Sequence, residues 1–306
     1  MKHAFIMDPL EGVKAHKDTS YFLMKGCVER GHEVCYLDQQ ALNLQHDDLY
    51  ARVTWLDVHE DADIPFTEIR HESLPLSHMD AVWIRTDPPF DRRYFYTTLM
   101  LDYLPQSTRV INRPEGIRNW NEKLAALMFP AFTPETRVTS DVAQILEMAE
   151  QSGRVTVKPV DGFGGKGIVF FSPGDPEQIL VDATRNGKHW VIVQQYLPEA
   201  ALGDKRILLL NGEPLGGILR VHAEGVELNN MDAGGTANPA QLNDRDLDVC
   251  AAVAPGLIEQ GVFFAGIDII GGMLIEVNVT SPTGLQEMSR FDGIDYHHQI
   301  ISALEQ

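Results

Sequence analysis

The stretch VKPVDGFGGKGIVFF, Val157–Phe171, holds the densest glycine cluster of the chain, and its surroundings decide the fold to which it belongs. Gly162, Gly164 and Gly167 match the string G-x-G-x-x-G. A dinucleotide-binding turn of this type needs a helix directly after the glycines, because the pyrophosphate lies on the N-terminus of that helix. Here the β-favouring run IVFF follows, so the pattern predicts a strand, a loop and a second strand.

The glycine loop can bind phosphate without being a P-loop. A P-loop requires G-x-x-x-x-G-K-[ST], and here Gly167 follows Lys166. In a glycine-rich hairpin, backbone N–H groups unobstructed by Cβ atoms can still converge on an anion. Lys158, at the end of the incoming strand, would supply a compact positive charge. On this segment alone, a plain hairpin tip with a surface lysine is an equal alternative.

A second stretch, GIDIIGGMLIEVNVTSPTG, places polar side chains on two neighbouring strands. Glu276 and Asn278 are two residues apart and share one face of their strand, whereas Ile275 is expected on the other face. A two-residue turn would place Asp268 opposite Ile275. A three-residue loop centred on Gly272 would place it opposite Glu276, and we expect this loop.

The three oxygen-bearing side chains Asp268, Glu276 and Asn278 would then converge on one point. Two carboxylates and an amide suit Mg²⁺ bridged to phosphates. The alternative is two acids on a strand that faces solvent. The apolar surroundings of Asp268 favour the metal, because an unpaired carboxylate in such a run would be costly.

Composition restricts the class of protein. The chain has 306 residues, 44% of them hydrophobic, which is typical of a globular protein with a substantial core. The 44 acidic residues outnumber the 25 basic ones, giving a net charge of −19. Because a nucleic-acid binder needs a basic surface to replace phosphate counterions, we expect no nucleic-acid partner. We also expect no membrane span and no signal peptide.

Cysteine usage favours a reducing cytoplasm. The three cysteines, Cys27, Cys35 and Cys250, are odd in number and widely spaced, and they form no C-x-x-C pair. Neither a disulfide framework nor a zinc ribbon is indicated. The adjacent His297 and His298 are interpreted as a surface or capping pair rather than as metal ligands.

Apolar periodicity and turn residues predict three regions with α/β and α+β character. An open α/β domain is expected over residues 1–119, a small α+β unit over 120–198, and an antiparallel-sheet domain over 199–306. Asn119–Leu124 is interpreted as a helix start, and Ser140 as the N-cap of a helix over 141–151. Asn211-Gly212 between apolar runs predicts a tight hairpin.

Together these features resemble the ATP-grasp ligases, and more closely the prokaryotic glutathione synthetases. The resemblance covers nearly the whole chain. Its motifs appear in order as MDP (7–9), KDTS (17–20), RTDPPFD (85–91), INRPEGIRNWNEKL (111–124), FTPET (132–136), VKPVDGFGGKGI (157–168), QQYLP (194–198), GDKRILLLNGEP (203–214), AGG (233–235) and EVNVTSPTG (276–284). The resemblance implies an ATP-grasp fold with an N-terminal pre-ATP-grasp domain, a lid and a C-terminal catalytic sheet.

The resemblance also implies roles for individual residues. Lys123 and Lys158 would hold the ATP phosphates, and Arg220 would stabilise an acyl phosphate. The remaining implied residues are Asp161, Gly162, Gly164 and Gly165 in the mobile glycine loop; Gln195, Tyr196 and Leu197 at the adenine; Asp204 at the ribose; Arg85, Ser281 and Thr283 at the substrates; and Asp268, Glu276 and Asn278 at the metal.

The implied reaction joins γ-glutamylcysteine to glycine, with ATP as co-substrate and Mg²⁺, or alternatively Mn²⁺, as the metal. An acyl phosphate would form and then be displaced by the amine. No protein nucleophile is needed, so catalysis would rest on positioning and on charge stabilisation. The resemblance further implies a homo-oligomer, a dimer or a tetramer.

Three positions depart from the pattern of the resembling family. Leu228 stands where an arginine is expected, and Asp232 adds a negative charge close by. Lys166, inside the glycine loop, is larger than the residue expected there. The departures leave two alternatives open: an ATP-grasp ligase with another donor or acceptor, and a nucleotide-binding module without turnover.

Overall fold

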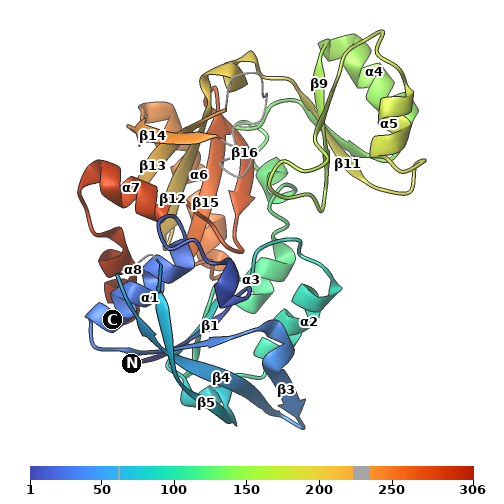
Figure 1. Ribbon diagram of the computed structural model, residues 1–306. Coiled ribbons are helices and arrows are strands. Elements are labelled where there is room, and N and C mark those ends of the chain that lie inside the picture. The colour runs from blue at the N-terminus through green and yellow to red at the C-terminus, as the bar shows by residue number, and fades with distance from the viewer. Residues whose placement is uncertain (61–62, 223–234) are drawn as a thin grey trace.

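The computed structural model describes residues 1–60, 63–222 and 235–306, and within these ranges the strands form three sheets (Figure 1). Leu228 and Asp232 lie outside the described residues. No helix in the described part of the chain has the length and apolar character needed to cross a membrane. The expected mixture of α/β and α+β regions is confirmed.

The first sheet has a parallel centre. β1 pairs in parallel with β2 and β6, and β6 pairs in parallel with β7, whereas β4 pairs antiparallel with β2. The sheet order is β3 (Leu42–Gln45), β4 (Asp48–Val58), β2 (Glu33–Leu37), β1 (Lys2–Ile6), β6 (Ala81–Ile84) and β7 (Arg109–Ile111), with β5 (Phe66–Pro75) paired to β4. Helices α1 (Thr19–Glu29) and α2 (Arg92–Leu101) begin after the aspartates Asp18 and Asp91, which cap them.

The second sheet is antiparallel and carries the glycine loop. Its order is β10 (Val169–Phe171), β9 (Val155–Pro159), β11 (Val191–Gln195) and β8 (Thr136–Thr139), packed against α4 (Val142–Ser152) and α5 (Gln178–Ala183). The loop joins β9 to β10, so the predicted strand–loop–strand order is confirmed. The expected cap was wrong by one residue: Asp141, not Ser140, accepts the bond from the Ala143 N–H.

The third sheet is also antiparallel, and helices cover both faces. Its order is β14 (Thr236–Ala240), β13 (Glu213–Val221), β12 (Asp204–Leu210), β15 (Phe264–Ile270) and β16 (Met273–Asn278). Helix α6 (Asp244–Glu259) packs on the face that carries Ile207, whereas α7 (Leu285–Asp292) and α8 (Tyr296–Leu304) share a core with Leu208. Short 3-10 turns complete the described chain: Leu10–Gly12, Gln39–Ala41, Leu76–His78, Ala125–Met128 and Pro198–Leu202.

The turn between β15 and β16 differs from the expected one. Gly271 and Gly272 form a two-residue turn, since Ile270 pairs with Met273. A β-bulge then shifts the register, and Asp268 lies opposite Glu276. The predicted pairing of these acids is confirmed, but the predicted three-residue loop was wrong. The bulge also brings Ile275 to the same cavity as Glu276, not to the opposite face.

The expected helix start at Asn119–Leu124 was also wrong. Helix α3 (Pro114–Asn119) ends there, and the turn that follows is hydrogen-bonded to β16 of the third sheet, from the Val277 N–H to the Glu122 carbonyl. Just before α3, the Asn112 side chain donates to the carbonyls of Phe264 and Val279 at 2.7 and 2.8 Å. This amide thus ties the first sheet to the two strands that carry Asp268 and Glu276.

Gly116 provides a stability test of the packing between α3 and the end of α6. A Cβ atom at this position would lie 2.3 Å from the Gln260 carbonyl oxygen. We expect Gly116→Ala to lower the free energy of unfolding by about 2–3 kcal/mol, because backbone must move to relieve the overlap. Gly12→Ala, where a Cβ meets nothing within 4 Å, is the control. Equal urea midpoints for the two variants would contradict this packing.

Candidate functional site

A cavity of about 480 Å³ lies between the glycine loop, the third sheet and the first-sheet loops. Its wall contains most residues to which the sequence pointed: Lys123, Lys158, Gly162, Gly164, Gly165, Gln195, Tyr196, Leu197, Asp204, Arg220, Asp268, Glu276, Asn278, Ser281 and Thr283. Arg85 is not part of this wall, and Asp161 lines a smaller neighbouring cavity. The cavity therefore gathers side chains from all three predicted regions.

Charged side chains form a row across the third sheet inside the cavity. In the strand register Arg206 lies opposite Asp268, and Asp268 lies opposite Glu276. Arg206 donates from Nε and Nη2 to the two oxygens of Asp268, each at 2.8 Å, and Arg220 Nη2 lies 2.9 Å from Asp268 Oδ2. Burial opposes ionisation of Asp268, but the two guanidinium groups outweigh it and hold its pKa well below the usual range.

The donor set at this point fits a hard divalent cation. Asp268 and Glu276 face one another, and Asn278 Nδ2 lies 3.3 Å from Asp268 Oδ2. Carboxylate and amide oxygens are the ligands that Mg²⁺ takes. The buried carboxylate is already paired with Arg206 and Arg220, so the cost of its burial alone no longer argues for a metal. The convergence of three oxygen-bearing side chains still does.

Two lysines approach the cavity from different segments. Lys158 on β9 donates to Gln194 Oε1 at 2.8 Å, and burial lowers the pKa of this lysine to about 8. Lys123 donates to Glu276 Oε1 at 2.7 Å and to the carbonyl oxygen of Gly162. Burial opposes the charge of Lys123, but Glu276 outweighs it and raises the pKa. Lys123 therefore links the glycine loop to the acidic row.

The glycine loop and the strand after it enclose one side of the cavity. Lys166, which the sequence left without a role, lies with Nζ 4.5 Å from the centre of the Phe163 ring, and both side chains line the cavity. The apolar part of the wall includes Ile168, Phe170, Leu197, Ile270 and Ile275. Such a mixture of an apolar end and a cationic end matches a ligand with a flat ring and phosphates.

Arg85 lies behind the cavity wall, where the sequence suggested a carboxylate-binding group. Its Nε donates to Ser20 Oγ and its Nη2 to the Pro282 carbonyl, each at 3.0 Å. Its Nη1 is buried and has no hydrogen-bond partner among the described residues. Arg85 thus fixes the backbone at Pro282 and keeps one donor unused.

The two hydroxyls expected near the substrates do reach the cavity. Ser281 Oγ donates to Asp87 Oδ1 at 2.8 Å, which joins the third sheet to the loop after β6. Thr283 Oγ1 accepts from Arg206 Nη1 at 3.1 Å. Thr283 therefore belongs to the same polar network as the acidic row, whereas Ser281 joins its part of the wall to Asp87.

Sequence reasoning missed three cations of the cavity wall: Arg206, Lys14 and Lys17. A signal for Arg206 was present, because Asp204 and Arg206 are two residues apart on one strand and so share a face. Lys14 and Lys17 precede α1 and line the first-domain side of the cavity. They carried no such signal, because nothing in their spacing places them near the third sheet.

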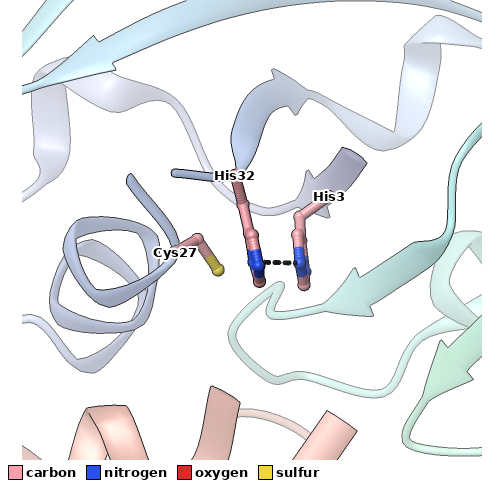
Figure 2. A group of neighbouring side chains, drawn as sticks. All are labelled: His3, Cys27 and His32. Atoms are coloured by element: carbon pink, nitrogen blue, oxygen red, sulfur yellow. Dashed lines mark hydrogen bonds between the residues drawn. The ribbon is translucent and has the colours of Figure 1, made fainter. Parts of the chain in front are cut away.

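A cluster of His3, Cys27 and His32 lies outside the cavity (Figure 2). The Trp83 N–H donates to His3 Nδ1 at 3.1 Å, and burial lowers the pKa of His3 to about 3, so this ring is neutral with its proton on Nε2. His3 Nε2 then donates to His32 Nδ1 at 3.0 Å. A metal on His3 Nε2 would move that proton to Nδ1, facing the Trp83 N–H. The cluster is therefore a directional hydrogen-bond chain.

A second cluster joins Glu29 to His297 and His298. The two Nε2 atoms lie 3.3 and 3.1 Å from Glu29 Oε2. Metal-bound histidines donate their other N–H to an acceptor, but both Nδ1 atoms are buried without a hydrogen-bond partner among the described residues. The geometry therefore favours pairing with a carboxylate over a bound metal. The interpretation as a surface pair was wrong for His297, which is buried.

The chain matches two family models that adjoin. Residues 1–118 match "Prokaryotic glutathione synthetase, N-terminal domain", and residues 122–293 match "Prokaryotic glutathione synthetase, ATP-grasp domain". The glutathione synthetase of Gloeobacter violaceus is 41% identical over 312 residues, which cover 99% of this chain and 96% of that protein. The glutathione synthetase of Vibrio cholerae is 36% identical over 309 residues, covering 100% and 97%.

Solved structures are similar in fold at low sequence identity. D-cycloserine synthetase DcsG has a TM-score of 0.66 and 17% identity, covering 99% of this chain and 100% of that one. A RimK domain ATP-grasp protein from Sphaerobacter thermophilus has a TM-score of 0.64 and 17% identity, covering 99% and 98%. The architecture is therefore the ATP-grasp fold.

Proposed function

Because the chain belongs to the prokaryotic glutathione synthetase family, we propose that it is an ATP-dependent peptide ligase that joins γ-glutamylcysteine to glycine. The products are glutathione, ADP and phosphate. One observation carries the proposal: a single cavity brings the two lysines, the glycine loop and the row of acids and arginines together. This combination suits phosphoryl transfer to a carboxylate followed by acyl transfer.

We assign the cationic and glycine-rich end of the cavity to the ATP phosphates. Lys123 and Lys158 would hold them, and backbone N–H groups of Gly162, Gly164 and Gly165 would close over them. Asp161 would keep this loop in place from its far side. Gln195, Tyr196 and Leu197 would line the adenine. Asp204, which pairs with Arg220, would accept ribose hydroxyls with its remaining lone pairs.

Asp268, Glu276 and Asn278 would hold Mg²⁺, or Mn²⁺ in its place, since oxygen donors suit both ions. When bound, the ion would neutralise charge on the phosphate oxygens. The three cations that now pair with these acids, Lys123, Arg206 and Arg220, would then be free to contact phosphate. Charge balance of the buried site is thus maintained before and after binding.

The two chemical steps need positioning rather than a protein nucleophile. The donor carboxylate attacks the γ-phosphorus of ATP, the bond to the β–γ bridging oxygen breaks, and ADP leaves. The glycine amine then attacks the acyl carbon, the C–O bond to phosphate breaks, and the amine loses a proton. Arg220 and Arg206 would stabilise the negative oxygens of both steps. The loop over the phosphates would exclude water from the acyl phosphate.

Substrate binding is assigned to the side of the cavity nearest the first sheet. Ser281 and Thr283 would contact the substrates directly. Arg85 would bind a donor carboxylate with its Nη1 once a rearrangement of the wall exposes that buried atom to the cavity, and Lys14 and Lys17 would attract the same anionic dipeptide. An acidic protein with a locally basic cavity is consistent with anionic substrates.

The deciding experiment is an ADP-release assay with γ-glutamylcysteine and a panel of amine acceptors, with the product identified by mass. Glutathione formed only with glycine is the expected result. ADP formed with another acceptor would replace the assigned substrate, an outcome that Leu228 and Asp232 make worth testing. Tight ATP binding without ADP formation from any dipeptide donor would contradict ligase activity altogether.

The pKa of Lys158 predicts how ATP affinity depends on pH. The free protein loses the Lys158 charge above about pH 8, whereas bound phosphate would favour the protonated amine. We expect the ATP dissociation constant to be flat below this pH and to rise up to about tenfold per pH unit above it, as binding takes up a proton. Calorimetry in buffers of different ionisation enthalpy measures both effects. A constant affinity between pH 7 and 9 would contradict the assignment.

We infer that the protein works in a reducing compartment, the cytoplasm, because Cys27, Cys35 and Cys250 are buried free thiols. We also propose a homo-oligomer, a dimer or a tetramer, which light scattering would test. The division into domains at residues 119 and 198 stays a prediction. Limited proteolysis of the free protein should cut first near these boundaries.

A further inference from the structure

Three consecutive residues, Asn121, Glu122 and Lys123, follow α3 and lie against β16 of the third sheet, and each makes different contacts. The Asn121 Oδ1 accepts from the backbone N–H groups of Lys123 and Leu124 at 3.1 and 3.0 Å, so it shapes the turn. Lys123 reaches Glu276. Glu122, which had no role in the site as described above, points to the end of β16.

Glu122 forms hydrogen bonds to the chain on both sides of Asn278. Its backbone oxygen accepts from the Val277 N–H at 2.8 Å. Its Oε1 accepts from the Val279 N–H at 3.1 Å, and from the Thr280 N–H and Oγ1 at 3.1 and 2.7 Å. One residue therefore fixes residues 277–280 through four hydrogen bonds, and Asn278 lies in the middle of that segment.

The contacts of Glu122 resemble those of a group that orients the ligands of a site. A partly buried carboxylate is unfavourable when its hydrogen-bond partners among the described residues include no cation, and burial, followed by the charge of Glu276, raises the pKa of Glu122. The three donors that converge on Oε1 offset this cost. Glu122 also lines the main cavity and the smaller neighbouring one, so replacing it would change the candidate site rather than a remote part of the core.

We propose that Glu122 is a positioning residue for the ligase reaction. It holds Asn278 and Ser281 in register with Lys123, its own neighbour in the chain, so that the metal-binding side chains and a phosphate-binding lysine meet at fixed spacing. The inference rests on the proposed function. It adds a residue that contacts no substrate and acts through the strand end that it holds.

The test compares Glu122→Ala with Glu122→Gln. Glu122→Ala removes all three side-chain bonds, and we expect kcat to fall about 10–100-fold, as for loss of a group that orients metal ligands. Glu122→Gln keeps a carbonyl oxygen at the Oε1 position and should stay close to wild type. Thr280→Val, which removes one of the three donors, should give an intermediate loss.

A second readout separates positioning from general stability. Calorimetry of ATP binding with and without Mg²⁺ measures how much the ion strengthens ATP binding. In Glu122→Ala we expect this gain to shrink about tenfold, while affinity for γ-glutamylcysteine is retained. Val249→Ala, in the buried core behind the same sheet, is the control: its melting temperature should fall with kcat and the Mg²⁺ gain unchanged.

The outcomes distinguish the inference from the proposed function. No ADP release by the wild-type protein would remove the proposed function. The role of Glu122 alone would be overturned by a different result: the wild type is active, and folded Glu122→Ala has the kcat of the wild type and the same strengthening of ATP binding by Mg²⁺. If Glu122→Ala does not fold, Thr280→Val decides: a lower kcat at a melting temperature no lower than that of Val249→Ala supports positioning, and an unchanged kcat refutes it.

Discussion

Glu276→Ala is expected to abolish ligase turnover, with kcat lower by about 1,000-fold, the upper range for loss of one electrostatic group in an active site. Two effects act together. The variant loses one of the two carboxylates proposed to hold the metal, and it frees Lys123 from the 2.7 Å ion pair that now fixes the lysine amine. ADP release with γ-glutamylcysteine, glycine and ATP measures the effect.

Matched variants show which of these two effects dominates. Glu276→Gln keeps the shape of the side chain and a hydrogen bond to Lys123 but removes the charge that a divalent cation needs, so it should be nearly as inactive as Glu276→Ala. Glu213→Ala, which removes an exposed acid from the same sheet, should behave as wild type. Near-normal turnover of Glu276→Ala, with an unchanged melting curve, would refute the metal assignment.

The pairing of Asp268 with Glu276 shows how much of the candidate site can be predicted from the sequence. Alternation along β16 placed Glu276 and Asn278 on one face, and the turn inferred at Gly271-Gly272 placed Asp268 opposite Glu276, an opposition that is confirmed. The predicted three-residue loop was wrong, because Gly271-Gly272 forms a two-residue turn. A β-bulge in the strand pair supplies the register shift that brings the two acids opposite each other. A bulge depends on packing against neighbouring strands, which periodicity within one strand does not reveal.

The cations that pair with Asp268 could not be predicted from the sequence. From the sequence, a metal was expected to compensate the charge of this buried carboxylate, because the apolar run around it contains no cation. The structure pairs it with Arg206 and Arg220, which lie 62 and 48 residues away in the chain. Long-range pairing of this type follows from sheet order. The sequence predicted the sheet as antiparallel and β16 beside β15, but it did not predict that β12 lies on the other side of β15.

Lys158→Met is expected to weaken ATP binding by about 10–100-fold, since it removes a charge-assisted hydrogen bond to phosphate worth about 1.5–3 kcal/mol. The same change should leave the melting temperature unchanged or raise it. In the free protein the Lys158 amine is buried and donates to Gln194, and burial lowers the pKa of this lysine to about 8. A thioether of similar length avoids this desolvation cost.

For Lys158→Met, the diagnostic result is an unchanged or higher melting temperature together with a weaker affinity for ATP. A lysine kept only for packing would lose stability and leave ATP binding intact, whereas a surface lysine would change neither. Lys188→Met, an exposed lysine of the same lid region, provides that neutral baseline. If Lys158→Met binds ATP with wild-type affinity at pH 7, or loses affinity only in proportion to a lower melting temperature, then Lys158 does not contact phosphate. A flat pH profile in a weakened Lys158→Met would in turn identify this amine as the group that titrates near pH 8.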